Sequence, residues 1–302
     1  MPTPTKTEES PFTSLDEALN REVILMGGGP GDGKTYSVAK IIEECEETGH
    51  QVVVIDRDRG LAKVVYDVMG RTPDCLHYAI CDKWEKVNQA VDFAFKNLGP
   101  GDWLVFEMIG AMWDFAQTEY SRKVYGDLTE HMLNLRAEAQ QVIRNAGLDP
   151  KSKDARKKVA EKVGFGGLDG RQDWSFIKRM HNDDVFIKAI VEGDFNILST
   201  TSMTPVAKDE AEKYPLWVTL GRRPTGEKEQ PHRHDTLVVV EKKGNKYVWR
   251  TDLGAREGKD RGGRKLVRDV DFTDIGFWRS YRDYHNLESV PSKQEDSDDD
   301  EY

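Results

Sequence analysis

The chain of 302 residues has little cysteine and no long apolar run. Its three cysteines, Cys45, Cys75 and Cys81, show neither CxxC nor zinc-ligand spacing, and an odd number does not suit a disulfide framework. No apolar stretch approaches the ~18 residues that a membrane span needs, and the N-terminal segment lacks an apolar signal-peptide core. These absences point away from secreted, disulfide-rich and membrane-spanning proteins. We therefore expect reduced thiols, no membrane partner and a cytoplasmic location in whatever cell hosts the chain.

The sequence also shows little sign of a histidine or cysteine metal site. His232 and His234 in "PHRHD" are the best candidates, and two histidines alone are too few ligands to predict one. What is present is a soluble, highly charged composition, with 37% hydrophobic and 32% charged residues. The length suits one large α/β domain or two small ones.

Charge is unevenly distributed along the chain, whose formal total is −10. The C-terminal "EDSDDDEY" is strongly acidic, whereas "KSKDARKKVAEK" (151–162) and "REGKDRGGRKLVR" (256–268) are locally basic. An acidic total therefore does not exclude a nucleic-acid partner. We expect residues 286–302 to form a disordered tail. This tail could compete with DNA for a basic groove, bind a partner protein, or only keep the chain soluble.

Short apolar runs alternate with helical patterns. The predicted strands are 22–27, 51–56, 103–109 and 195–201, and the predicted helices between them are 35–50, 83–98 and 184–193. This alternation is typical of a mostly parallel sheet flanked by helices. Residues 236–252 form two β runs around Gly244-Asn245, which predicts a hairpin and antiparallel strands at the C-terminal side.

More than eighty residues separate the strands at 103–109 and 195–201, far more than an ordinary crossover. They include a predicted long helix at 118–147. The predicted organisation is a polar leader at 1–20, an α/β core at 21–285 with a helical insertion at about 113–183, and the acidic tail.

Gly28–Thr35 fits the pattern GxxxxGK[ST], directly after a predicted strand and at the start of a predicted helix. Glycines let backbone N–H groups surround phosphate oxygens, and the helix adds the positive end of its dipole. We expect Lys34 to reach the β- and γ-phosphates and the Thr35 hydroxyl to bind Mg²⁺. The predicted nucleotide-binding set is Gly28, Gly29, Pro30, Gly31, Asp32, Gly33, Lys34, Thr35 and Tyr36.

Three predicted parallel strands end in polar residues, and such ends meet at one edge of a sheet. The first ends in Asp56 and Asp58, the second in Glu107, and the third in Thr200, Thr201 and Ser202. Hydrolysis needs a carboxylate that anchors the metal, a group that activates water and a group that senses the γ-phosphate.

We assign these roles to Glu107 (through water), Asp58 and Thr201 respectively. The alternatives are that Asp56 and Asp58 form a turn and cap a helix, and that Glu107 pairs with a nearby base.

These residues resemble the RecA-like family of P-loop ATPases, in particular phage-encoded members related to single-strand annealing recombinases. "GGGPGDGKT" is similar to the family's Walker A motif, "VVVIDRDRG" to its strand with an acidic catalytic residue, "WLVFEMIGAMW" to Walker B and "FNILSTTSM" to the sensor strand. "PTGEKEQPHRHDTLVVVEKKGNKYVWRTD" resembles the terminal strands. Glu107 stands where the family usually has Asp, and Asp58 where it usually has Glu, which fits a weak ATPase.

The resemblance implies ATP and Mg²⁺ as cofactors, a homo-oligomer, and DNA recombination, annealing or replication as the process. A basic finger from a neighbouring subunit is expected, with Arg250, Arg256 and Arg261 as candidates. Single-stranded DNA would contact Lys151, Lys153, Arg156, Lys157 and Lys158, and Trp174 or Phe165 could stack on bases. The alternative is a nucleotide-switched assembly or packaging factor whose insertion binds protein and not DNA.

Overall fold

The computed structural model describes residues 21–126, 128–163, 170–206, 217, 220–252 and 266–287. Its centre is a nine-stranded sheet with the order β3-β2-β4-β5-β1-β7-β8-β9, in which β6 pairs with β5. The strands are β1 (Val23–Gly28), β2 (Val52–Asp56), β3 (Leu76–Ile80), β4 (Trp103–Glu107), β5 (Asn196–Pro205), β6 (Arg222–Pro224), β7 (Thr236–Lys243), β8 (Lys246–Arg250) and β9 (Val270–Asp271).

The first five strands and β7 run parallel, whereas β8, β9 and β6 pair antiparallel. The predicted fold class is therefore confirmed, including the antiparallel C-terminal strands. The hairpin predicted around Gly244-Asn245 is formed by β7 and β8.

Helices cover both faces of the sheet. They are α2 (Lys34–Thr48), α3 (Leu61–Met69), α4 (Trp84–Asn97), α5 (Ile109–Tyr125), α6 (Leu128–Asn145), α7 (Lys153–Lys162), α8 (Gly170–Lys178), the π-helix η1 (Arg179–Ile187), α9 (Lys188–Glu192), α10 (Gln230–Arg233) and α11 (Phe277–His285). Successive residues of the central strands point to opposite faces, which makes two cores.

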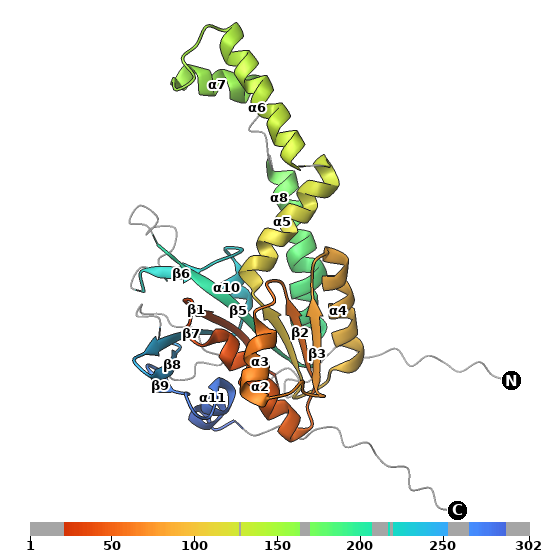
Figure 1. Cartoon of the computed structure of the whole chain (residues 1–302), viewed down its shortest axis with the longest axis vertical. Helices are drawn as coiled ribbons and strands as arrows, with labels where there is room; N and C mark the ends of the chain where they lie inside the picture. Colours follow the sequence, from red (N-terminus) through yellow and green to blue (C-terminus); the bar gives the residue numbers. More distant parts are fainter. Residues whose placement is uncertain are drawn as a thin grey trace, which may run out of the picture.

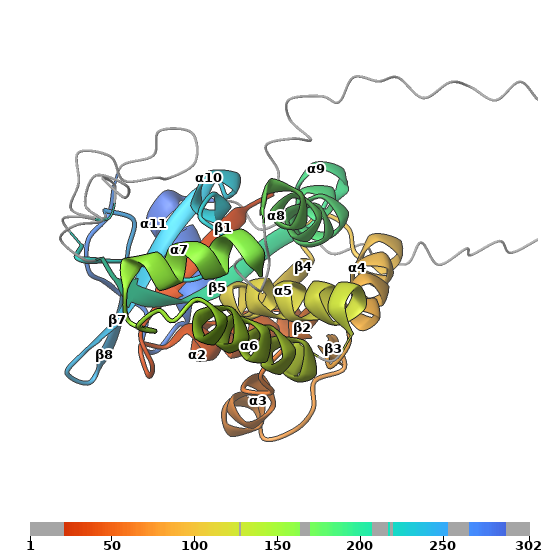
Figure 2. The ribbon, with the colours of Figure 1, turned by 90° about the horizontal axis from the view of Figure 1, so that it is seen from above.

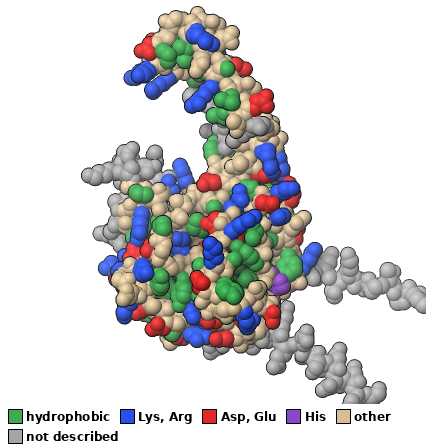
Figure 3. All heavy atoms as spheres, viewed as in Figure 1, with side chains coloured by type: hydrophobic (Ala, Val, Ile, Leu, Met, Phe, Trp, Pro, Cys, Tyr) green, Lys and Arg blue, Asp and Glu red, His purple; other side chains and the backbone are tan. Residues whose placement is uncertain are grey.

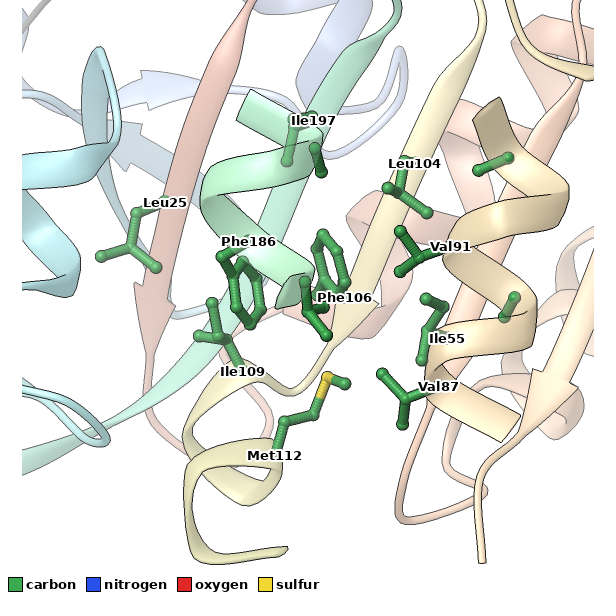
Figure 4. Packing of buried hydrophobic residues seen from close by; sticks show 14 of the residues in the cluster. Leu25, Ile55, Val87, Val91, Leu104, Phe106, Ile109, Met112, Phe186 and Ile197 are labelled. Atoms are coloured by element: carbon green, nitrogen blue, oxygen red, sulfur yellow. The ribbon is translucent and has the colours of Figure 1, made fainter. Parts of the chain in front are cut away.

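One core lies between the sheet and α4, α5 and η1. Val91, Ile109 and Phe186 of these helices pack against Leu104 and Phe106 of β4 (Figure 4). The other core joins α2, α3 and α11 to the opposite face of the same strands. Because strands β1, β2 and β4 are buried on both faces, they appear in the sequence as short continuous apolar runs. Strand β5 is buried over Asn196–Thr201, although only Ile197 and Leu198 are apolar there.

The insertion between β4 and β5 is helical and reaches away from the sheet. Helices α6 and α7 form a projecting hairpin, which we call the arm, and α5 and α8 lie at its base (Figures 1 and 2). The single helix predicted at 118–147 is wrong. Helix α5 stops at Gly126, which has φ +74° and donates its N–H to Arg122 O, before α6 starts.

Two other elements differ from the sequence prediction. Strand β3 was not predicted, because its residues are only half-buried at the edge of the sheet and include His77 and Tyr78. The helix predicted at 184–193 is the second half of η1 followed by α9. Among the described residues, no helix combines the length and the apolar character that a membrane crossing requires.

Candidate functional site

The glycine-rich loop joins β1 to α2 at the carboxyl edge of the sheet. Gly31 and Gly33 have φ values of +79° and +97°, a region that suits glycine. A Cβ atom at Gly33 would lie 2.8 Å from the Tyr247 ring. The first helical bond of α2 runs from Ser37 N to Gly33 O at 2.8 Å, so the N–H groups of residues 34–36 precede it. These N–H groups form an anion-binding helix terminus.

Lys34 is folded back over this loop. Its Nζ donates to Gly28 O and Gly29 O, both at 2.9 Å, and the residue is only 7% exposed. Burial lowers the pKa of Lys34, while the carboxylates of Glu107, Asp32 and Asp58 oppose this shift. The ammonium therefore sits where the loop would hold phosphate, surrounded by acceptors that a phosphate can replace.

The β7–β8 hairpin supports the loop from the side. Asp32 Oδ2 accepts from Gly29 N at 2.6 Å, and its Oδ1 accepts from Lys242 N at 3.2 Å. Tyr36 stacks on Tyr247 with ring centroids 5.5 Å apart. The carboxylate of Asp32 thus ties the loop to strand β7 of the hairpin.

Glu107, at the end of β4, is buried, with only 2% of the residue exposed. Its Oε1 accepts from Thr35 Oγ1 at 2.8 Å, and its Oε2 accepts from Thr200 Oγ1 at 2.5 Å. Burial raises the pKa of Glu107 to about 6, and the charges of Asp56 and Asp58 add to the shift while the two hydroxyls oppose it. The predicted pair of Thr35 and Glu107 is thus in direct contact.

The sequence alone assigns no role to Thr200, which is one of three polar residues at the end of its predicted strand. The parallel register that pairs Phe106 with Ser199 places Thr200 beside Glu107. This register depends on the order of the sheet, which a single sequence does not reveal. Alternation along β5 could have suggested that only one of Thr200 and Thr201 faces the carboxylate.

Asp56 and Asp58 lie two residues apart in different surroundings. Asp56 is fully buried and accepts from the N–H groups of Asp58 and Arg59 at 2.8 Å and from Tyr78 OH at 2.5 Å. Asp56 therefore shapes the turn after β2, in line with the turn-forming alternative. Asp58 is exposed at the edge. Partial desolvation, with the charge of Asp56 beside it, raises the pKa of Asp58.

Thr201 points away from Glu107. It is fully buried and its Oγ1 lies 3.0 Å from both Thr225 O and Thr225 Oγ1, with Ser202 O at 3.2 Å. These contacts join β5 to the segment after β6. A contact between Thr201 and a γ-phosphate stays a prediction.

The other predicted residues lie outside this cluster. Arg250, at the end of β8, donates from Nε to Asp252 O at 2.5 Å, and Arg256 and Arg261 lie outside the described residues, as does Phe165. Lys151, Lys153, Arg156, Lys157 and Lys158 are all exposed on or beside α7, far along the chain from the loop. Trp174 is 40% exposed and stacks on Trp113.

Thr35 and Glu107 offer oxygen donors, the kind that Mg²⁺ takes, next to a loop that can hold its phosphate partners. The residues present therefore fit a nucleotide with Mg²⁺. No cluster of three or more histidine, cysteine or acidic side chains suited to a metal occurs in the described part of the chain. Nor does the pair at residues 232 and 234 make one, because His234 is buried against Ser199 Oγ and Gln230 O.

Comparison with known proteins adds little to this geometry. No protein-family model matches the chain, and no curated protein does either. Among solved structures, the chain is similar to the KaiC-like protein PH0186 from the hyperthermophilic archaeon Pyrococcus horikoshii OT3, with 13% sequence identity, a TM-score of 0.39, and 83% of this chain and 84% of that chain covered. The topology and contacts described above therefore carry the assignment of this site.

Proposed function

We propose that the chain is a RecA-like P-loop ATPase that binds ATP with Mg²⁺ at Gly28–Thr35 and hydrolyses it. The observation that carries this proposal is the contact of Thr35 with Glu107 beside the folded-back Lys34. The strand order supports it, because β5 lies between the loop strand β1 and the Glu107 strand β4. Thr35 in the first turn of α2 and Glu107 at the end of β4 therefore meet at one edge of the sheet.

Each residue has a distinct task in this proposal. Lys34 leaves the carbonyls of Gly28 and Gly29 and neutralises charge on the β- and γ-phosphates. Thr35 directly and Glu107 through a water would hold the Mg²⁺ ion, which would further neutralise phosphate charge. Asp58, exposed and with a raised pKa, orients and deprotonates the attacking water.

The test is ATP hydrolysis by the wild-type chain and by Lys34→Ala, with ATP binding measured in parallel. We expect Lys34→Ala to lose both. A control variant, Lys63→Ala, changes an exposed lysine of α3 and should behave like the wild type. Equal hydrolysis by wild type and Lys34→Ala would contradict the proposal.

We also propose that the basic residues at 151–158 bind single-stranded DNA. The five basic residues at 151–158 are exposed, and none makes an ion pair with any described residue. Many lysines of the body do pair, such as Lys86 with Asp82 and Lys246 with Asp271, both at 2.7 Å. Free cations on a projecting helix suit a phosphate backbone. In Figure 3, lysine and arginine side chains gather at the end of the arm.

The DNA proposal is tested by reversing Lys153, Arg156, Lys157 and Lys158 to glutamate and measuring salt-sensitive binding of single-stranded DNA. Reversal of Lys63, Lys83, Lys96 and Lys228, which are exposed on the body, is the matched control. Loss of binding in the first set alone supports a role in recombination, annealing or replication. Unchanged binding would favour the alternative, a nucleotide-switched assembly or packaging factor whose insertion binds protein.

A further inference from the structure

The arm contains an apolar groove that no described part of the chain fills. The groove has a volume of about 440 Å³ and lies between α6 and α7. Its floor and walls include Leu135, Ala139 and Ile143 of α6 and Val159, Ala160 and Val163 of α7. Met132 at its margin is 44% exposed, although Ala155 between the helices is fully buried. The two helices are therefore in contact around Ala155 and are further apart near Met132.

Cations border this groove. Arg136 of α6 and Arg156 of α7 line it, both are exposed, and neither makes an ion pair with any described residue. An occupant that matches these features carries apolar side chains at helical spacing and acidic side chains beside them. A short amphipathic helix laid into a groove has this pattern.

We propose that the groove binds residues 12–19 of the leader of a second copy of this chain. In "PFTSLDEALN" (11–20), Leu15 and Leu19 are four residues apart, which places them on one face of a helix, and Phe12 adds an apolar side chain just before that helix. Ser14 and Glu17 have the spacing of a capping box, which favours a helix start at this point. Asp16 and Glu17 supply the negative charges that Arg136 and Arg156 would meet.

The acidic tail is a poorer match for the same groove. Residues 288–302 contain no aliphatic side chain apart from Val290 and Pro291, and Leu287, which precedes them, packs against the core beside α2 and α11. Such a segment can meet the cations of the rim but cannot fill the apolar floor. The combination of apolar and acidic residues therefore selects the leader.

The leader cannot reach the groove of its own molecule. Arg21 is anchored at the amino edge of the sheet, where its guanidinium donates to Gly193 O and Ile190 O. The six residues from Leu15 to Arg21 span at most about 21 Å when fully extended. Helix α5 begins at the opposite edge, beyond the ~17–20 Å length of β1, and it adds about 25 Å before the arm begins at α6. The docking is therefore between copies.

Docking of the leader of one copy into the arm of the next is a heterologous contact. Each copy then carries one free leader and one free groove, so the copies form a ring if the rotation closes and a filament if it does not. This inference goes beyond the proposed ATPase and does not depend on it, since it involves neither the loop nor Glu107.

The experiment measures self-association of the full chain by sedimentation velocity and light scattering, without nucleotide or nucleic acid. One variant reverses the leader (Asp16→Lys, Glu17→Lys), one reverses the groove (Arg136→Glu, Arg156→Glu), and a third carries all four changes. We expect each reversal to weaken association by about tenfold or more, the effect of losing charge pairs worth ~1.4 kcal/mol. The third variant should recover to within about threefold of the wild type.

Two controls make the outcome specific. Reversal of Lys63 and Lys83 on the body should leave association unchanged, and circular dichroism checks that every variant is folded. A labelled peptide of residues 8–20 should bind a chain that lacks residues 1–20, and a peptide of residues 291–302 should not compete. The inference is overturned if the wild type stays monomeric, if leader reversal changes nothing, if the tail peptide binds instead, or if groove reversal affects only DNA binding.

Discussion

Glu107 is expected to make the folded chain less stable than it would be with a neutral side chain at this position. The carboxyl is 2% exposed and its pKa is raised from 4.5 to about 6. The folded state therefore binds the proton more tightly than the unfolded state between these values. The free energy of unfolding accordingly falls as pH rises through this window, and the loss is complete above pH 6.

The size of this effect follows from the shift. A difference of about 1.5 pKa units corresponds to about 2 kcal/mol, because one unit is about 1.4 kcal/mol. Glu107→Gln, which is neutral at every pH and still accepts a hydrogen bond, should therefore stabilise the chain by about 2 kcal/mol at pH 8. At pH 5, where the folded carboxyl is mostly protonated, the gain should shrink to about 0.8 kcal/mol.

Urea unfolding of both chains at pH 5 and pH 8, without nucleotide, measures this difference. Glu107→Asp keeps the charge and serves as the control, and it should show no gain at pH 8. Mg²⁺-dependent ATP binding should be lost in Glu107→Gln, so that stability and function change in opposite directions. The reasoning is refuted if Glu107→Gln is no more stable than wild type at pH 8, or if its gain is independent of pH.

Three further results are expected. Asp58→Asn should lower the rate of hydrolysis by about 10²–10⁴-fold while ATP affinity stays within about threefold, and an equal loss of affinity would reveal a binding role instead. Gly33→Ala should cost about 1–3 kcal/mol in urea unfolding, because φ is +97° and the new Cβ meets Tyr247; Gly147→Ala, with positive φ but open space, should cost less. Burial lowers the pKa of His181 to about 4, so the contribution of this histidine to the free energy of unfolding should fall by about 2 kcal/mol between pH 8 and pH 5. Urea unfolding should therefore show that His181→Phe loses about 2 kcal/mol less than the wild type over this pH range, because the opposite contribution of Glu107 is present in both chains.

Local pattern was enough to predict most of the sheet. Strands β1, β2 and β4 each begin with a short apolar run, and the ends of β2, β4 and β5 carry the polar residues that meet at one edge. The loop at Gly28–Thr35 was predictable because its spacing and its strand–helix context coincide. Glu107 was predictable for a related reason, since a carboxylate that ends a buried strand must lie at the carboxyl edge.

The remaining features depend on which elements lie side by side in the fold, and the sequence does not reveal this. Edge strand β3 is half-buried, so it lacks the continuous apolar run of a central strand. Thr200 acquires its contact with Glu107 only through the order of β4 and β5. The break between α5 and α6 rests on one glycine inside an otherwise continuous helical pattern, and a glycine alone is a weak stop signal.

The position of α5 has a mechanical consequence. This helix begins at Ile109, two residues after Glu107, and the arm continues from its far end (Figure 1). Helix α5 has 17 residues and is thus about 25 Å long, so a tilt of about 5° at its first turn moves its last turn by about 2 Å. The displacement grows further along α6. The Glu107 carboxylate and the groove in the arm therefore lie at opposite ends of the successive helices α5 and α6, and α5 transmits any rotation near Glu107 to the base of the arm.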